Sequence, residues 1–119
     1  MKRTEHGEQS ALVEACAWLE NQRPELALLF AIPNGGERHP AVAARLKAEG
    51  VKPGVPDLFL PVARGGHHGL WIEMKAGRNR STANQLAWAE RLRGQGYRVE
   101  VCYGAEAALA VLVEYLQCT

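Results

Sequence analysis

The chain has 119 residues, of which 47% are hydrophobic and 23% charged, and its formal net charge is +1. These values predict one globular domain over residues 1–119, because the chain is long enough for a core of its own and too apolar for disorder. Its polar start and the lack of a long apolar run predict neither secretion nor a membrane span, and three cysteines without a Cys-x-x-Cys spacing argue against a disulfide framework or a zinc ribbon.

The first predicted element is a helix over residues 5–21, because Leu12, Ala15 and Leu19 recur on one stripe. Glu8 begins the same stripe, although the rest of the stripe faces the predicted core. A glutamate in a first helical turn is stabilised by the helix dipole. Glu8 therefore has either this structural role or a role in a functional site.

The next segment predicts a strand, a turn and a second helix. A continuous apolar run at residues 26–32 is typical of a buried strand. The sequence Pro-Asn-Gly-Gly at residues 33–36 predicts a turn directly after it. Pro40 suits the first turn of the helix that follows, and Gly50 suits its end.

Two short apolar segments, at residues 58–60 and 69–75, are joined by a glycine- and histidine-rich connection and predict an antiparallel hairpin. Side chains alternate along a strand, so Glu73 and Lys75 project from the same face. Antiparallel pairing also brings Asp57 beside Glu73. The hairpin therefore gathers two carboxylates and one ammonium group at one point.

Two carboxylates this close repel one another unless one takes up a proton or a cation lies between them. Mg²⁺ prefers oxygen ligands, and a lysine beside such an ion can hold a water molecule for attack on a phosphodiester. Asp57, Glu73 and Lys75 therefore predict metal-assisted phosphodiester hydrolysis. The structural alternative is that Asp57 caps a turn and that Glu73 and Lys75 form an exposed ion pair, which contributes little to stability.

The last part of the chain predicts a helix, a strand and a helix. Ser81 or Thr82 caps the first helix, and Gln85 follows Thr82 at the spacing of a capping box, which gives Gln85 a structural explanation. Residues 97–103 alternate as a strand, which a helical crossover makes parallel to the preceding one, and residues 105–117 form an apolar helix. The order α-β-α-β-β-α-β-α predicts an α/β fold with a mixed central sheet flanked by helices.

A set of motifs around Pro56-Asp57 and Glu73-Met74-Lys75 extends from about residue 8 to residue 115. Its further members are Pro-Asn-Gly-Gly at 33–36, Arg38, Gly-Val-Lys-Pro-Gly-Val-Pro-Asp at 50–57, Gly-Leu-Trp-Ile-Glu-Met-Lys at 69–75, residues 81–85 and Gly-Tyr-Arg-Val-Glu-Val at 96–101. In order and spacing, this set resembles the VRR-NUC family of PD-(D/E)xK nucleases, in the stand-alone form found in phages and bacteria.

The resemblance implies a restriction-endonuclease-like core and a Mg²⁺- or Mn²⁺-dependent DNA endonuclease. The ion would be bound by Asp57, Glu73 and the main-chain carbonyl of Met74, with Glu8 completing or supporting its shell. Such an enzyme would act in the cytoplasm of a bacterium or of a phage-infected host cell.

The resemblance also implies that Lys75 orients the attacking water and that Gln85 positions the water or the lysine, so Gln85 has a second explanation beside the capping box. The net charge gives no global argument for nucleic acid, but basic residues follow the candidate site. The candidate contacts to DNA phosphates are Arg38, Lys52, Arg78 and Arg80.

Stand-alone members of this family resemble Holliday-junction resolvases. The implied substrate is therefore branched or four-way-junction DNA, and the implied assembly is a homodimer, whose two-fold symmetry presents two sites to opposed strands. Two alternatives remain open at this point. One is a nicking or flap nuclease without junction preference, and the other is a catalytically silent DNA-binding module.

Overall fold

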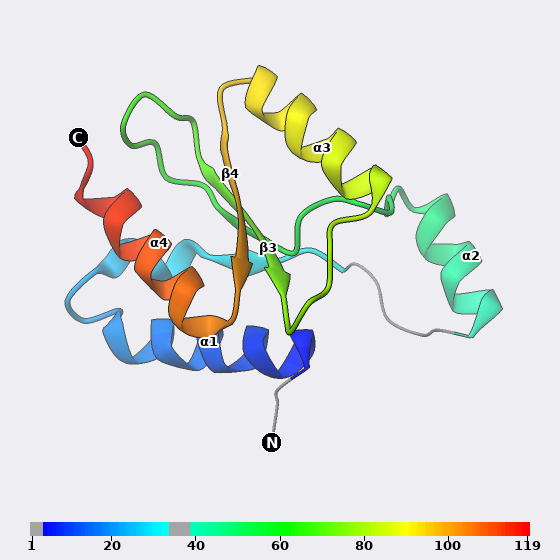
Figure 1. The fold of residues 1–119 in the computed structure, drawn as a ribbon, viewed down its shortest axis with the longest axis horizontal. Helices are drawn as coiled ribbons and strands as arrows, with labels where there is room; N and C mark the ends of the chain where they lie inside the picture. The colour runs from blue at the N-terminus through cyan, green and yellow to red at the C-terminus, as the bar shows by residue number, and fades with distance from the viewer. Residues whose placement is uncertain (1–3, 34–38) are drawn as a thin grey trace.

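A four-stranded mixed sheet forms the centre of the computed structural model, which describes residues 4–33 and 39–119 (Figure 1). Its strands, in spatial order, are β1 (Phe30–Ala31), β2 (Leu58–Leu60), β3 (Leu70–Lys75) and β4 (Arg98–Tyr103). The pairs β1–β2 and β2–β3 are antiparallel, whereas β3–β4 is parallel. The hairpin, the parallel crossover and the α/β class predicted from the sequence are thus confirmed.

The helices lie on both faces of this sheet. They are α1 (Glu5–Leu19), α2 (Pro40–Ala48), α3 (Ala83–Gly94) and α4 (Ala105–Gln117), with a 3₁₀ helix η1 (Pro24–Leu28) before β1. Figure 1 shows α3 across the β3–β4 pair from α4. Within the described residues, no helix is long and apolar enough to cross a membrane.

The main core lies between the sheet and the pair α1 and α4. Ile72 and Met74 face it from β3, Leu12 from α1 and Leu112 from α4, and all four are almost completely buried. Tyr115 is also buried there, and its hydroxyl donates a 2.6 Å hydrogen bond to the carbonyl of Val62. Because side chains alternate along β3, the residues on either side of Met74 must face the opposite side, where α3 lies.

The buried strand predicted at residues 26–32 is wrong in extent and in environment. Pro24 starts a 3₁₀ turn, so Leu26 is buried at 2% exposure while Leu28 is 52% exposed. Proline fixes φ at a helical value and suits the first position of a helix. Only two residues then remain for β1, and Phe30 is 49% exposed rather than buried.

The outcomes differ for the first helix, the second helix and the turn between them. The first helix ends at Leu19 rather than at residue 21, and a difference of one or two residues is usual at helix ends. The predicted helix that begins at Pro40 is confirmed as α2, which buries none of its residues and lies apart from the sheet in Figure 1. Apart from Pro33, the predicted turn at residues 33–36 lies outside the described residues.

Candidate active site

The β2–β3 hairpin brings Asp57 and Glu73 together. Leu58 pairs with Ile72, so the next position along each strand places Asp57 opposite Glu73. Asp57 Oδ2 accepts a 2.7 Å hydrogen bond from the backbone N–H of Met74, and the two carboxyl groups are close enough to influence each other's pKa. Pairing in the hairpin therefore fixes the two acids against one another.

Lys75 lies on the same face of β3 as Glu73, and both residues are 4% exposed. Its ammonium nitrogen Nζ is 3.8 Å from Glu73 Oε2. This pair is therefore not the exposed ion pair of the structural alternative. Removing two charged groups from water costs about several kcal/mol per ion, even after the protein has relaxed around them. The two groups therefore need further polar partners.

Gln85, in the first turn of α3, provides such partners. Its Oε1 accepts hydrogen bonds of 2.8 Å from Lys75 Nζ and of 2.8 Å from the backbone N–H of Thr82. Its Nε2 donates a 3.0 Å hydrogen bond to Glu73 Oε2, and Thr82 Oγ1 accepts the backbone N–H of Gln85 at 3.2 Å. Gln85 is therefore the capping-box partner and a contact of the buried charges at the same time.

Burial raises the pKa values of both acids. For Glu73, burial is the largest cause and the neighbouring Asp57 carboxylate the next, and together they raise its pKa to about 8. Burial likewise raises the pKa of Asp57, although the Met74 N–H partly opposes the shift. With both acids ionised and Lys75 charged, the site carries a net charge of −1, so a cation would be stabilised there.

One atom of the site is available to such a cation. Glu73 Oε1 is buried and has no hydrogen-bond partner among the described residues. Across residues 4–33 and 39–119, no group of three or more His, Cys, Asp or Glu side chains has the arrangement of a metal site. Two carboxylates suit Mg²⁺, which is usually held by one or two carboxylates together with waters and substrate phosphates.

Two glutamates of α1 lie near this edge of the sheet. Glu8 Oε1 accepts the backbone N–H of Ala105 at 3.5 Å, at the first residue of α4. Glu5 is the site-proximal acid that sequence reasoning missed: after the larger effect of burial, its charge also raises the pKa values of Asp57 and Glu73. Its position three residues before Glu8, on the same helical face, is the signal that predicts this proximity.

The predicted DNA contacts flank the same end of β3. Lys52, Arg78 and Arg80 are exposed, and within the described part of the chain they have no ion-pair partner. The loop with Lys52 packs against the start of α3, because Gly54 lies against the backbone of Asn84. Arg38 lies outside the described residues.

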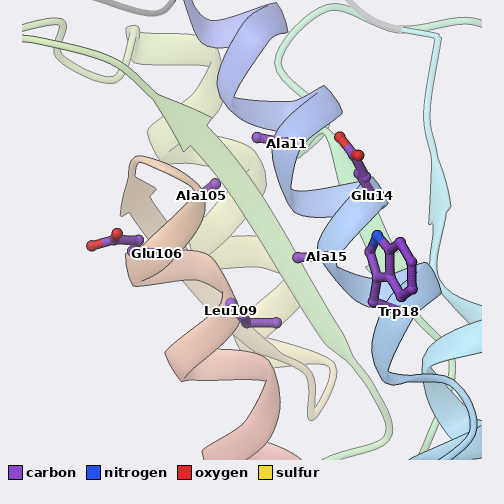
Figure 2. A pocket seen from close by; sticks show the side chains of 7 residues that line it. All are labelled: Ala11, Glu14, Ala15, Trp18, Ala105, Glu106 and Leu109. Atoms are coloured by element: carbon purple, nitrogen blue, oxygen red, sulfur yellow. The ribbon is translucent and has the colours of Figure 1, made fainter.

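The side of the sheet covered by α1 and α4 has a hollow with two glutamates among its lining residues. A pocket of about 340 Å³ lies between α1 and α4 (Figure 2) and is lined by Ala11, Glu14, Ala15, Trp18, Ala105, Glu106 and Leu109. The carboxylates of Glu14 and Glu106 repel phosphates. The surface suited to a polyanion is therefore the one that carries Lys52, Arg78 and Arg80, rather than the α1–α4 side.

Comparison with known proteins identifies the family and the fold of the chain. The model of the VRR-NUC domain matches residues 6–106. A solved structure described as a VRR_NUC domain protein is similar over 98% of this chain and 91% of its own, with 31% sequence identity and a TM-score of 0.80. None of the curated proteins matches. The chain belongs to the VRR-NUC family of nucleases, whose substrate is DNA.

Proposed function

We propose that residues 1–119 form one Mg²⁺- or Mn²⁺-dependent DNA endonuclease domain. The observation that carries this proposal is the group of half-buried Asp57 with buried Glu73 and Lys75, in which Nζ of Lys75 lies 3.8 Å from Glu73 Oε2 and 2.8 Å from Gln85 Oε1. A buried charge cluster is costly when the only purpose is stability. Catalysis of phosphodiester hydrolysis gives this cluster a use that a silent DNA-binding module lacks.

Asp57, Glu73 and the main-chain carbonyl of Met74 would hold the ion. The partnerless Glu73 Oε1 and the raised pKa of Glu73 support this donor set, since a bound cation would pair the oxygen and offset the repulsion from Asp57. When bound, a divalent ion stabilises the charge that develops on the phosphodiester and lowers the pKa of a water. The resemblance assigns Glu8 to the shell, whereas the influence of Glu5 on both acids favours Glu5 as the contributor from α1.

Lys75 would orient the attacking water. Its ammonium group has three N–H donors, one of which is directed to Gln85 Oε1, so the group retains donors for a water and for a phosphate oxygen. Gln85 is a positioning residue in this scheme, because it fixes Lys75 from one side and Glu73 from the other. Holding both groups in place lowers the entropy cost of bringing water and phosphate together.

Exposed cations would bind the DNA backbone on either side of the scissile phosphate. Lys52, Arg78 and Arg80 lie on the two loops that border the carboxylates, and Arg38 is proposed as a fourth contact. Each phosphate contact releases counterions, so binding should weaken with salt with a slope of about one logarithmic unit per contact. Alanine at these positions is expected to reduce that slope.

For the substrate we propose branched DNA, with the four-way junction as the principal form, cut by a homodimer. Support comes from the resemblance of the motifs to stand-alone members of the family, and from symmetry, since a two-fold dimer presents two equivalent sites to opposed strands.

The test uses the wild-type chain with Lys75→Ala and Asp57→Ala. With Mg²⁺, the wild type is expected to cut, and Lys75→Ala to lose about 10²–10⁴-fold in rate while titration calorimetry still detects ion binding. Asp57→Ala should lose the calorimetric signal. Loss of metal affinity in Lys75→Ala without loss of cutting would contradict the roles assigned here.

The choice of substrate is tested with end-labelled four-way junctions, flaps and plain duplex of matched sequence. Faster cutting of junctions, together with a dimer in light scattering, supports the resolvase proposal. Equal cutting of flaps and junctions favours the nicking or flap nuclease. Binding of DNA and metal without any cutting favours the silent module and overturns the proposal of an enzyme.

A further inference from the structure

A row of aromatic side chains crosses the sheet beside the candidate active site. Phe30 of β1 pairs with Phe59 of β2, and Phe59 pairs with Trp71 of β3. The rings of Phe30 and Phe59 meet edge to face with centroids 5.8 Å apart, and those of Phe59 and Trp71 are stacked at 4.2 Å. These three residues are called the aromatic row below.

The aromatic row lies on the same sheet face as the buried charges. Side chains alternate along a strand, so Trp71, Glu73 and Lys75 project from the same side of β3. Two residues along a strand advance about 6.6 Å, which is roughly two base-stacking steps of about 3.4 Å. A nucleotide one or two positions from a phosphate at the candidate site therefore lies level with Trp71, and Phe30 lies at the same level two strands across the sheet, at about 4.8 Å per strand.

The row is accessible at its β1 end. Phe30 is 49% exposed, and among the described elements the substantial neighbour of β1 is β2. The middle of the row is held in place, because the Phe59 ring lies directly on the backbone of Gly69, where a Cβ atom would approach the ring to 2.8 Å. An exposed ring that packs on ordered neighbouring rings is a surface on which a flat molecule can stack without much loss of entropy.

We propose that the aromatic row is a stacking site for an unpaired base in the DNA strand that is cut. This inference rests on the proposed function and specifies its substrate as DNA in which a nucleotide within two positions of the scissile phosphate is unpaired, or unpairs at the branch point of a junction. Bases in an intact duplex have no free face, whereas every unpaired base has one, so the site selects structure rather than sequence. Cleavage is thereby directed to branch points, flaps and gaps.

The charge pattern supports DNA as the occupant. The exposed cations Lys52, Arg78 and Arg80 lie on loops beyond one end of the β2–β3 hairpin, and the aromatic row lies toward its other end. A strand that follows this face meets cations, then the carboxylates, then aromatic rings. A second copy of the chain is the other class of partner for an exposed aromatic face, and the test below separates the two.

The experiment measures DNA binding with Mg²⁺ in a Lys75→Ala background, in which cutting is too slow to disturb the measurement. The probes are a flap duplex with 2-aminopurine at the first or second unpaired nucleotide, and an intact duplex of the same sequence. Phe30→Ala and Phe30→Leu remove the ring, and Phe30→Leu keeps apolar volume. The control is Trp18→Ala, which removes a 79% exposed ring from α1.

In the Lys75→Ala background, we expect 2-aminopurine fluorescence to be quenched on binding. With Phe30→Ala or Phe30→Leu added, the quenching should be lost and affinity for the flap should fall by about 5-fold or more. Affinity for the intact duplex should be unchanged, and Trp18→Ala should match its parent on both probes.

Three results overturn the inference. They leave the proposed function intact as long as the wild type cuts DNA. The first is equal binding of flap and duplex in all variants. The second is full flap affinity and quenching in Phe30→Leu. The third is a dimer in light scattering that Phe30→Ala converts to a monomer, with equal loss of affinity for both probes, which would make the row a contact between two copies. A wild type that cuts no DNA removes the proposed function instead.

Discussion

The ammonium group of Lys75 donates a 2.8 Å hydrogen bond to Oε1 of Gln85, the same oxygen that accepts the backbone N–H of Thr82. One side-chain atom therefore joins the end of β3 to the N-terminus of α3. Since the Thr82 N–H is one of the donors that a helix start leaves unsatisfied, the position of Lys75 and the capping of α3 depend on the same residue.

Separate substitutions distinguish the two tasks of Gln85. Thr82→Ala removes the hydroxyl that accepts the Gln85 N–H but keeps the bonds from Gln85 to Lys75 and Glu73. It should lower the free energy of unfolding by about 1 kcal/mol. The cleavage rate should change by less than about 3-fold. Gln85→Ala should cost similar stability and reduce kcat by about 10²-fold, because Lys75 loses its fixed direction.

Urea unfolding and single-turnover cleavage measure these two quantities. Gln85→Met serves as the control for side-chain volume, and its kcat should fall as in Gln85→Ala. Equal losses of kcat in Thr82→Ala and Gln85→Ala would mean that the cap alone matters, which would refute a positioning role for Gln85.

Stability without divalent ions should decrease as the pH rises. Burial and Asp57 raise the pKa of Glu73 to about 8 from its ordinary 4.5, so between these values the folded chain holds a proton that the unfolded chain releases. The free energy of unfolding then falls with pH, by on the order of 3 kcal/mol between pH 5 and pH 8. Urea unfolding in EDTA measures this slope, and Mg²⁺ should restore stability at pH 8.

Glu73→Gln supplies the comparison, because an amide cannot titrate. Its slope between pH 5 and pH 8 should be smaller than that of the wild type, whereas substitution of the exposed Glu90 on α3 by Gln should leave the slope unchanged. Stability that rises from pH 5 to pH 8 in EDTA, or an unaltered slope in Glu73→Gln, would contradict the raised pKa.

The two glutamates of α1 should differ in their effect on ion binding. Glu5→Gln removes a charge that acts on both Asp57 and Glu73 but keeps an oxygen that can accept from Asn79 Nδ2, now bonded at 2.6 Å. We expect Mg²⁺ affinity to fall by about 10-fold, a coupling of about 1.4 kcal/mol. Glu8→Gln should change affinity less. The reverse order in titration calorimetry would assign the shell to Glu8, as the resemblance implies.

Local rules predicted the central parts of this molecule correctly. Alternation along residues 69–75 and the antiparallel hairpin led directly to the placement of Asp57 opposite Glu73, because register follows once both strands are identified. The capping-box spacing of Thr82 and Gln85 likewise identified the start of α3. The spacing alone could not decide whether Gln85 caps α3 or contacts the buried charges, since that depends on where α3 packs.

Features that depend on tertiary placement were missed. The apolar run at residues 26–32 has the composition of a buried strand, yet Pro24 starts a 3₁₀ turn and Phe30 faces outward, so composition was a poor guide to exposure. The aromatic row needs three strands in one register before it exists. Glu5 gained its proximity to Asp57 only through the packing of α1 against the sheet.

The loop before Asp57 should be sensitive to a single methyl group at Gly54. Gly54 and Gly50 both have positive φ, at +94° and +100°, but a Cβ at Gly54 would lie 2.8 Å from the backbone of Asn84, whereas one at Gly50 meets nothing within 4 Å. Alanine at either position costs about 1–2 kcal/mol of backbone strain. Gly54→Ala should cost more and should also lower kcat, because it displaces the start of α3 from the acids, and Gly50→Ala should leave kcat unchanged. Urea unfolding and cleavage rates measure both effects, and equal losses in the two variants would show that the contact with Asn84 has no part in positioning the site.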